Sequence, residues 1–127
     1  RRVLEGEAFE VWGGEQRRDL AYADDVAAAF LAAADAPPGV YNLGGAPPLS
    51  LRDLAEALLA ANGGGRYVVK AFPAERAKID MGSYVADDSR FRAATGWAPR
   101  VPLEEGLRRT LDWFRPRLDL YLRETDP

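Results

Sequence analysis

The chain has 127 residues, 47% of them hydrophobic and 29% charged, with a formal net charge of −3 at pH 7. This composition is typical of one soluble globular domain with a modest core. There is no cysteine and no histidine, which excludes disulfides, thiolate or imidazole metal ligands, and catalytic devices that pair a nucleophile with histidine. The acidic balance without a basic run argues against a nucleic-acid partner. The lack of a signal peptide or a long apolar run predicts a cytoplasmic protein without a membrane partner.

The first elements expected are two short strands and a helix. Hydrophobic residues before a glycine pair predict a strand over Glu7–Trp12, and Leu20–Tyr22 is expected to form the next strand. Asp24 or Asp25 can then serve as the N-cap of a helix. Apolar residues at three- and four-residue spacing predict that this helix covers residues 26–36.

The middle of the chain predicts a strand, a helix and a further strand. Val40–Leu43 is a compact apolar run that favours a strand. Ser50 and Asp53 form a capping-box pattern, in which each side chain can satisfy the backbone amide of the other residue. Apolar residues at helical spacing predict a helix over Leu51–Asn62, ended by three glycines. Tyr67–Val69 is expected to form the next strand.

The last third is expected to contain two helices. Pro73–Tyr84 predicts a polar connection, and a short helix is expected over Arg90–Thr95, capped by the acidic residues before it and closed by Gly96. The final helix begins near Leu103, and Pro116 must kink or restart it, since proline lacks an amide donor. The pattern as a whole predicts an α+β domain with about four helices and several short strands, rather than a complete doubly wound cofactor domain.

The stretch Arg17–Val26 carries the most chemical information. A planar guanidinium such as that of Arg18, placed at the mouth of a strand, suits a doubly charged phosphate because its forked donors match the phosphate oxygens. The residues of this stretch also fit a salt bridge between Arg18 and a nearby carboxylate, with Asp24 and Asp25 capping a helix. The residues of this stretch alone leave both interpretations open.

Four separated segments resemble one family. They are Arg18–Val26, Val40–Gly44, Ala86–Pro99 and Leu103–Leu107. In this order and at these intervals they resemble the C-terminal half of the extended short-chain dehydrogenases/reductases, namely the NAD-dependent nucleotide-sugar epimerases and dehydratases. The resemblance covers nearly the whole chain, from about Val3 to Tyr121.

The layout of that family implies which parts this chain lacks. In the family, an N-terminal Rossmann half holds NAD and supplies a catalytic Tyr-x-x-x-Lys pair, and the C-terminal half binds the nucleotide sugar. The sequence has neither a G-x-x-G-x-x-G turn after a strand nor a Tyr-x-x-x-Lys pair, and it begins without Met. We therefore expect residues 1–127 to be the nucleotide-sugar-binding domain of a longer chain, with no catalytic residue of its own.

The same resemblance implies a cofactor and partners. NAD would be bound by the missing Rossmann half and not by these residues. The partners would be the nucleotide-sugar substrate, that Rossmann half and, in the intact enzyme, a second copy in a homodimer. We expect the isolated chain to be inactive.

Three residues are implied to lie beside the nucleotide base, namely Glu10, Val11 and Trp12. In the family an aromatic residue at the position of Trp12 packs on a pyrimidine, and backbone groups read the edge of the base. Such stacking is worth roughly 1–3 kcal/mol per base. Without a ligand role, Trp12 would be a core residue at the end of a strand.

Three further residues are implied at the diphosphate. Arg18 matches the arginine that grips it. A second arginine of the family precedes the aspartate matched by Asp87; Ala77 stands at its position here, and Arg76, one residue farther away, is the candidate. Asp80 falls where the family often has an aspartate near that arginine, and it can hold the guanidinium or contact the ribose.

The sequence thus supports two classes of function. The first is the substrate-binding part of an NAD-dependent nucleotide-sugar epimerase, most like the UDP-glucose 4-epimerases, with a dehydratase or reductase of the same family as the close alternative. The second is a standalone binding module without catalysis. The first predicts an exposed apolar face where the Rossmann half docks, whereas the second predicts a well-hydrated surface.

Overall fold

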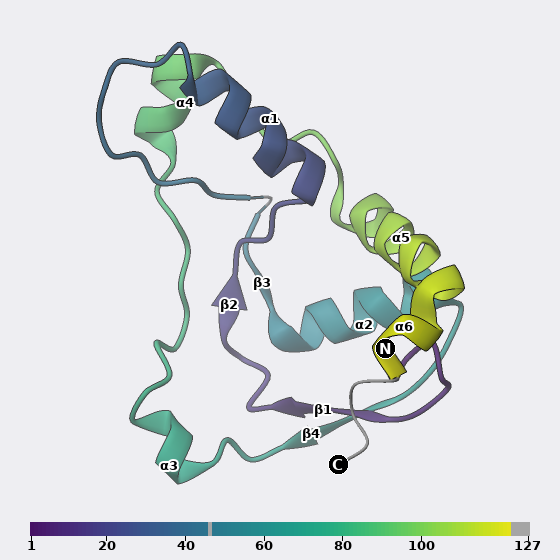
Figure 1. Ribbon diagram of the computed structural model, residues 1–127. Coiled ribbons are helices and arrows are strands. Elements are labelled where there is room, and N and C mark those ends of the chain that lie inside the picture. Colours follow the sequence, from purple (N-terminus) through teal and green to yellow (C-terminus); the bar gives the residue numbers. More distant parts are fainter. Residues whose placement is uncertain (46, 123–127) are drawn as a thin grey trace.

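The computed structural model describes residues 1–45 and 47–122, with the backbone alone at residues 77 and 122. The elements along the chain are β1 (Phe9–Trp12), β2 (Arg17–Arg18), α1 (Ala23–Ala33), β3 (Leu49–Ser50), α2 (Leu51–Asn62), β4 (Tyr67–Lys70), α3 (Ala74–Ala77), α4 (Ser89–Thr95), α5 (Leu103–Phe114), the 3-10 helix η1 (Arg115–Arg117) and α6 (Leu118–Leu122) (Figure 1). The predicted α+β class is confirmed. Within these residues no helix is both long and apolar enough to cross a membrane.

Strands β1 and β4 form a parallel ribbon, which confirms the strands predicted at these two places. Trp12 stands opposite Lys70 in the register. Helix α2 packs against β1, and the side chain of Val11 is only 7% exposed. Because side chains alternate between the two faces of a strand, Glu10 and Trp12 lie on the face opposite to Val11. The ribbon therefore has one packed face and one open face.

Helix α2 begins and ends as the sequence predicts. The amide of Asp53 donates to the hydroxyl of Ser50 at 3.0 Å, and the amide of Ser50 donates to the carboxylate of Asp53 at 3.1 Å. Hydrogen bonding from Ser50 lowers the pKa of the Asp53 carboxyl. At the other end, Gly63 adopts a φ of +79°, which an L side chain rarely tolerates. The helix so fixed packs against α5.

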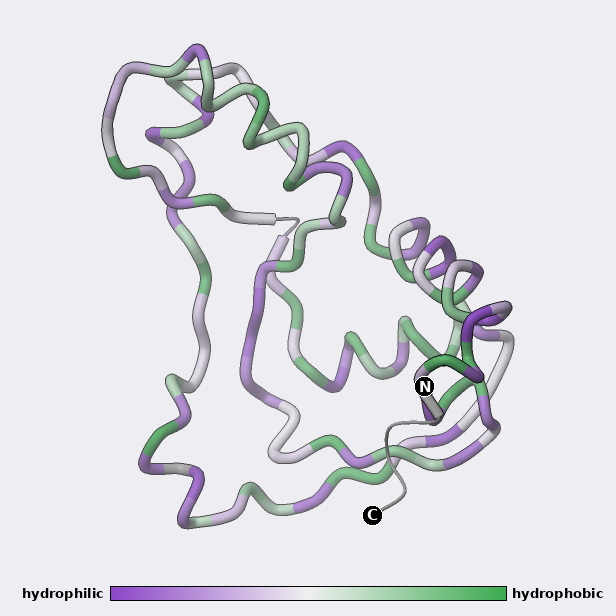
Figure 2. Tube along the Cα trace, viewed as in Figure 1, coloured by the Kyte–Doolittle hydropathy of each residue, from purple (hydrophilic) through white to green (hydrophobic). Residues whose placement is uncertain are grey.

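An apolar cluster joins α1 to α4 at one end of the molecule (Figure 1). Ala29 of α1 packs with Phe91 of α4 and with Trp97, and the two aromatic ring centroids are 5.6 Å apart. Gly96, with a φ of +69°, ends α4 and turns Trp97 back over it, as predicted. Figure 2 shows that α1 is hydrophobic along most of its length. This cluster buries only part of that apolar surface, since Phe30 remains 74% exposed.

The expected N-cap role of Asp24 or Asp25 is wrong. Helix α1 begins earlier, and its N-cap residue is Tyr22, whose side chain makes no capping bond. Asp25 is 5% exposed and accepts a hydrogen bond from the amide of Val101 at 2.9 Å. The indole of Trp97 donates to the carbonyl oxygen of Asp25 at 3.0 Å. Both bonds join α1 to the segment after α4, so this residue serves tertiary structure and not the helix end.

Two of the predicted strands are wrong. Leu20–Tyr22 is irregular. The residues that pair are Arg17–Arg18 of β2, just before it, which run antiparallel to Leu49–Ser50 of β3. Val40–Leu43 is also irregular. A strand is held by the backbone of a neighbouring strand, and within the described residues neither stretch belongs to a sheet. Local composition predicted an extended backbone but could not supply a partner.

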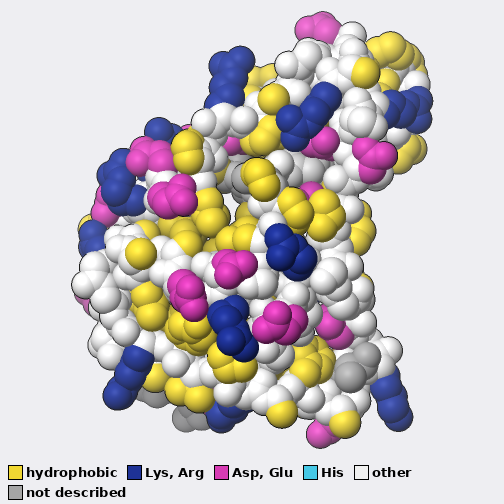
Figure 3. Space-filling model, turned by 180° about the vertical axis from the view of Figure 1, so that it is seen from behind, with side chains coloured by type: hydrophobic (Ala, Val, Ile, Leu, Met, Phe, Trp, Pro, Cys, Tyr) yellow, Lys and Arg dark blue, Asp and Glu magenta, His cyan; other side chains and the backbone are white. Residues whose placement is uncertain are grey.

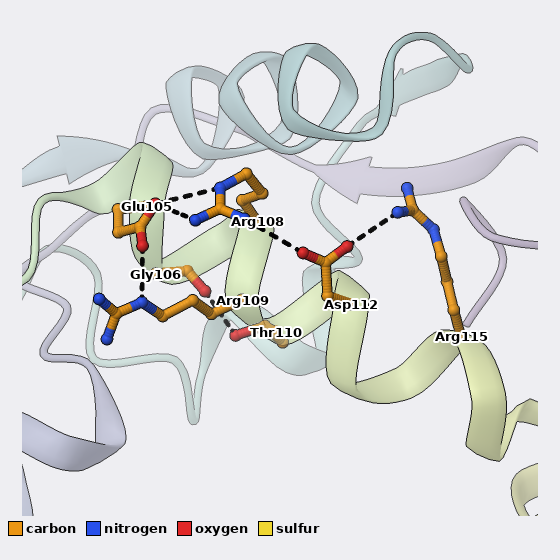
Figure 4. Close-up of polar contacts among 7 residues, drawn as sticks. All are labelled: Glu105, Gly106, Arg108, Arg109, Thr110, Asp112 and Arg115. Carbon is orange, nitrogen blue, oxygen red and sulfur yellow. Dashed lines mark hydrogen bonds and ion pairs between the residues drawn. The ribbon is translucent and has the colours of Figure 1, made fainter.

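The C-terminal helices confirm a restart at Pro116, because α5 gives way there to η1 and then α6. The polar side of α5 carries a chain of ion pairs (Figure 4). Glu105 binds Arg108 at 2.6 Å and Arg109 at 2.7 Å, and Arg108 also lies 3.3 Å from Asp112. Hydrogen bonding from Arg108, and then from Arg109, lowers the pKa of the Glu105 carboxyl. These groups face water, so the pairs contribute little to stability.

Replacing Asp25 by Ala is expected to lower the free energy of unfolding by about 1–3 kcal/mol, because the amide of Val101 loses its acceptor in a partly buried place. The matched control is Asp24→Ala, which removes an equal charge from the same helical turn. The Asp24 side chain is 75% exposed and 3.8 Å from Arg109, so its loss should cost less than about 0.5 kcal/mol. Urea unfolding followed by circular dichroism measures both, and equal losses would contradict the role given to Asp25.

Candidate functional site

Five of the six candidate residues lie in two groups, and the buried side chain of Val11 lies apart from both. Trp12, Glu10 and Arg76 form the first group, and Arg18 and Asp80 form the second. A helical turn that follows α3 joins the groups, since the amide of Asp80 donates to the carbonyl oxygen of Arg76 at 2.9 Å. The sequence predicted only a polar connection here, so helix α3 is a correction. It is this short helix that carries Arg76 toward Trp12.

Trp12 is half-buried on the open face of the β1–β4 ribbon. Its indole N–H donates to the carboxylate of Glu10 at 3.2 Å, and the same carboxylate binds the ammonium of Lys70 at 2.5 Å. Hydrogen bonding from Lys70, and then from Trp12, lowers the pKa of the Glu10 carboxyl. Glu10 is therefore ionised at neutral pH and is already engaged in holding the indole and the lysine.

Two further groups flank the indole ring. The guanidinium carbon of Arg76 lies 4.5 Å from the Trp12 ring centroid, and Phe72 meets the ring edge-on with centroids 6.5 Å apart. Trp12 thus combines a polar anchor at its nitrogen with a cation over its face. An aromatic ring held in this way is a platform on which a planar group can stack.

The side chain of Val11 points away from this platform and is buried against α2. The backbone of Val11 faces β4. The amides of Phe9 and Gly13 donate to the carbonyl oxygens of Arg66 and Lys70, and every second residue of a strand directs its backbone groups to the same edge. Glu10 and Trp12 direct their backbone groups to the opposite edge of β1, where no strand pairs within the described residues. Any backbone contact with a base would therefore come from Glu10 or from the amide of Trp12, because the Trp12 carbonyl oxygen already accepts hydrogen bonds from Gly14 and Gln16.

Arg18 lies against the segment that follows α3. Its guanidinium donates to the carbonyl oxygens of Gly82 and Arg17 and lies 3.8 Å from the carboxylate of Asp80. Asp80 in turn accepts a hydrogen bond from the amide of Gly82 at 3.1 Å. The Arg18 side chain is 26% exposed, which leaves it within reach of a ligand while its position is fixed.

The carboxylate that the salt-bridge interpretation required for Arg18 is Asp80. Asp19 accepts the amide of Ala86 at 3.0 Å instead, and Asp24 lies beside Arg109. A separation of 3.8 Å is at the limit of an ion pair, and such a pair in partial contact with water is weak. Asp80 therefore orients the guanidinium without occupying all of its donors.

Sequence reasoning missed Lys70, Phe72 and Gly82, which all touch candidate residues. Both strands of the ribbon were predicted, and alternation along them places Lys70 on the same face as its partner in the register, Trp12. No local sequence pattern predicts that β1 pairs with β4, so the contact between these residues could not be predicted. Gly82 contributes a backbone carbonyl, which any residue type could supply.

The described residues hold no cluster of metal ligands, and the N-termini of α1 and α2 do not suit the pyrophosphate of NAD. No three metal-binding side chains gather in this part of the chain. A dinucleotide is held where a glycine-rich turn leads from a strand to free amides at a helix N-terminus. Asp24 and Asp25 place carboxylates in the first turn of α1, and the capping box of Ser50 and Asp53 occupies the N-terminus of α2.

Comparison with known proteins finds a family that the chain resembles. The family model of the NAD dependent epimerase/dehydratase family matches residues 1–44. A UDP-glucuronate 4-epimerase of Thermodesulfobacterium geofontis is 31% identical over 93% of this chain and 36% of its own length. A dTDP-D-glucose 4,6-dehydratase of Mus musculus is 33% identical over 80% of this chain and 30% of its own length.

A solved structure shows the same relation in three dimensions. The UDP-glucose 4-epimerase of Thermotoga maritima, crystallised with UDP-glucose, is 32% identical and superposes with a TM-score of 0.81 over 92% of this chain and 38% of its own. This chain thus spans only about a third of the length of the relatives it matches. By sequence and by fold, the chain is similar to part of the NAD-dependent epimerases and dehydratases.

Proposed function

We propose that this chain is the nucleotide-sugar-binding domain of an NAD-dependent epimerase, most like the UDP-glucose 4-epimerases. The observation that carries the proposal is the placement of Arg18. Its guanidinium lies beside Asp80, and one helical turn connects Asp80 to Arg76, which lies over the ring of Trp12. The likeness to a UDP-glucose 4-epimerase crystallised with UDP-glucose supports it. The alternative function is that of a dehydratase of the same family, which the similarity to a dTDP-D-glucose 4,6-dehydratase supports.

The proposed binding mode uses the two residue groups for two parts of one ligand. The base stacks on Trp12, and the diphosphate accepts hydrogen bonds from Arg18 and Arg76. A guanidinium can give two parallel donors to phosphate oxygens, and such charge-assisted bonds are among the stronger ones in proteins. Holding these remote groups leaves the sugar free to turn and directs binding energy to its position at the reacting carbon.

The chemical step belongs, in this proposal, to the part of the protein that the chain does not include. NAD, when bound there, supplies the hydride acceptor. The residues of this chain bind and orient the substrate, and none of them acts as a catalytic residue. We also propose, from the family resemblance, that the intact enzyme is a homodimer.

An exposed apolar face supports docking of that other part. Phe30, Leu31 and Val40 are 74%, 77% and 85% exposed. They border an apolar groove lined by residues of α1, α4 and the segment before Pro47. Figure 3 shows hydrophobic side chains at the surface of the lobe that contains α1 and α4. The Val40–Leu43 segment favours a strand yet is unpaired in the described residues. A standalone module would have to expose these apolar side chains and this unpaired segment to water.

Arg18→Lys in the full protein is expected to weaken UDP-glucose binding by about ten- to a hundred-fold, because lysine keeps the charge but loses the fork. Arg18→Ala should weaken it at least as much. Isothermal titration calorimetry measures affinity, and a thermal melt measures stability. Arg17→Ala is the matched control, since Arg17 is the exposed neighbour whose guanidinium donates to the carbonyl oxygen of Pro48.

The two interpretations of Arg18 separate in these measurements. A ligand residue changes affinity far more than the melting temperature. If Arg18 serves only to hold Asp80 and Gly82, both variants lower the melting temperature and leave affinity unchanged. That second result would remove Arg18 from the site.

The isolated 127-residue chain is expected to convert no UDP-glucose to UDP-galactose, even with NAD supplied, and to bind NAD weakly. The reason is that the family's glycine-rich turn and Tyr-x-x-x-Lys pair are both missing from the sequence. A coupled assay for UDP-galactose, with the full protein as positive control, tests this. Turnover by the chain alone would overturn the assignment of the chemistry to another part.

The isolated chain is also expected to bind a hydrophobic dye through the α1 face, because an uncovered interface exposes a contiguous apolar patch. Phe30→Ser combined with Leu31→Ser should reduce dye fluorescence at least about two-fold, since it removes the two large exposed side chains that α1 gives to that patch. The matched control is Ile79→Ser with Met81→Ser, which removes two equally exposed apolar residues elsewhere. Equal reductions in the two pairs would argue against a docking face on α1.

A further inference from the structure

The guanidinium of Arg76 rests on the ring of Trp12, with its central carbon 4.5 Å from the ring centroid. Arg76 belongs to the short helix α3 and is exposed. No ion pair to Arg76 is recorded among the described residues, whereas several other arginines pair with carboxylates. The indole face is thus the main partner of this cation in the absence of a ligand.

Arg76 covers a face of the indole on which a planar base could stack. Trp12 is half-buried on the ribbon, and the exposed side chain of Arg76 lies over one face of its ring. Glu10 holds the indole nitrogen and keeps the ring from turning away. A base that stacks on this face of Trp12 must therefore displace the guanidinium.

We propose that Arg76 makes the site selective for diphosphate-bearing nucleotides over nucleosides. A nucleoside must remove Arg76 from Trp12 and gives the cation no new partner. A nucleoside diphosphate offers phosphate oxygens to the displaced guanidinium, so the loss of the cation–π contact is offset by charge-assisted hydrogen bonds. The inference rests on the proposed function, since it takes the Trp12 face as the base-binding surface.

The proposal predicts effects of opposite sign from one substitution. Arg76→Ala frees the indole face, so uridine should bind about two- to five-fold more tightly, the value of an exposed cation–π contact. The same variant loses a phosphate ligand, so UDP should bind about ten-fold or more weakly. A residue that merely supported the fold would change both affinities in the same direction.

The experiment compares uridine and UDP on the full protein by calorimetry or ligand-observed NMR, with thermal melts to confirm folding. The matched control is Arg117→Ala, because Arg117 lies 4.5 Å over the ring of Trp113 on the C-terminal helices. That variant should leave both affinities unchanged. Arg76→Lys, which keeps the charge but stacks less well, should fall between wild type and Arg76→Ala for uridine.

Each outcome bears on the proposal. Tighter uridine binding with weaker UDP binding in Arg76→Ala supports it. Unchanged or weaker uridine binding in that variant, with UDP binding still present in the wild type, overturns the selectivity role while leaving the proposed function standing. If the wild type binds neither UDP nor uridine, the proposed function fails and the selectivity role fails with it.

Discussion

The parallel pairing of β1 with β4 is the constraint on which the candidate site depends. Pairing fixes which face of β1 turns inward, so Val11 is buried against α2 while Glu10 and Trp12 face outward. It also sets Lys70 opposite Trp12, where its ammonium can hold Glu10. Parallel ribbons are normally covered on both faces. Here one face is covered by a helix and the other presents an aromatic ring with charged neighbours, which is where a ligand can complete the packing.

A second set of long-range contacts determines the position of Arg18. The amide of Arg17 donates to the hydroxyl of Ser83 at 3.0 Å, and the amide of Tyr84 donates to the carbonyl oxygen of Arg17 at 3.0 Å. These bonds hold the segment after α3 against β2, so that Arg18 meets Gly82 and Asp80. Because α3 begins the same segment, one piece of chain positions both arginines of the candidate site, Arg18 and Arg76.

The features predicted correctly from the sequence are those with a local cause. The capping box of Ser50 and Asp53 and the glycine that ends α4 each involve residues a few positions apart, and the backbone conformation they need follows from residue type. Val40–Leu43 failed as a strand because pairing needs a second segment, which composition does not reveal. The contact between Arg76 and Trp12 was not foreseen for a related reason, since it depends on how β1 and α3 are brought together.

The link between β2 and α1 connects the ligand-facing residues to the apolar face. Arg18 is followed by Asp19, whose carboxylate binds the amide of Ala86, and then by Leu20 and Tyr22. A Cβ at Gly45 would collide with the carbonyl oxygen of Leu20, and one at Gly106 would come within 3.1 Å of the Tyr22 ring. Glycine at both positions therefore lets neighbouring backbone close on this link, which leaves it little freedom to bend. The proposed docking face on α1 and the candidate phosphate ligand Arg18 are therefore joined by a short segment that neighbouring backbone packs tightly.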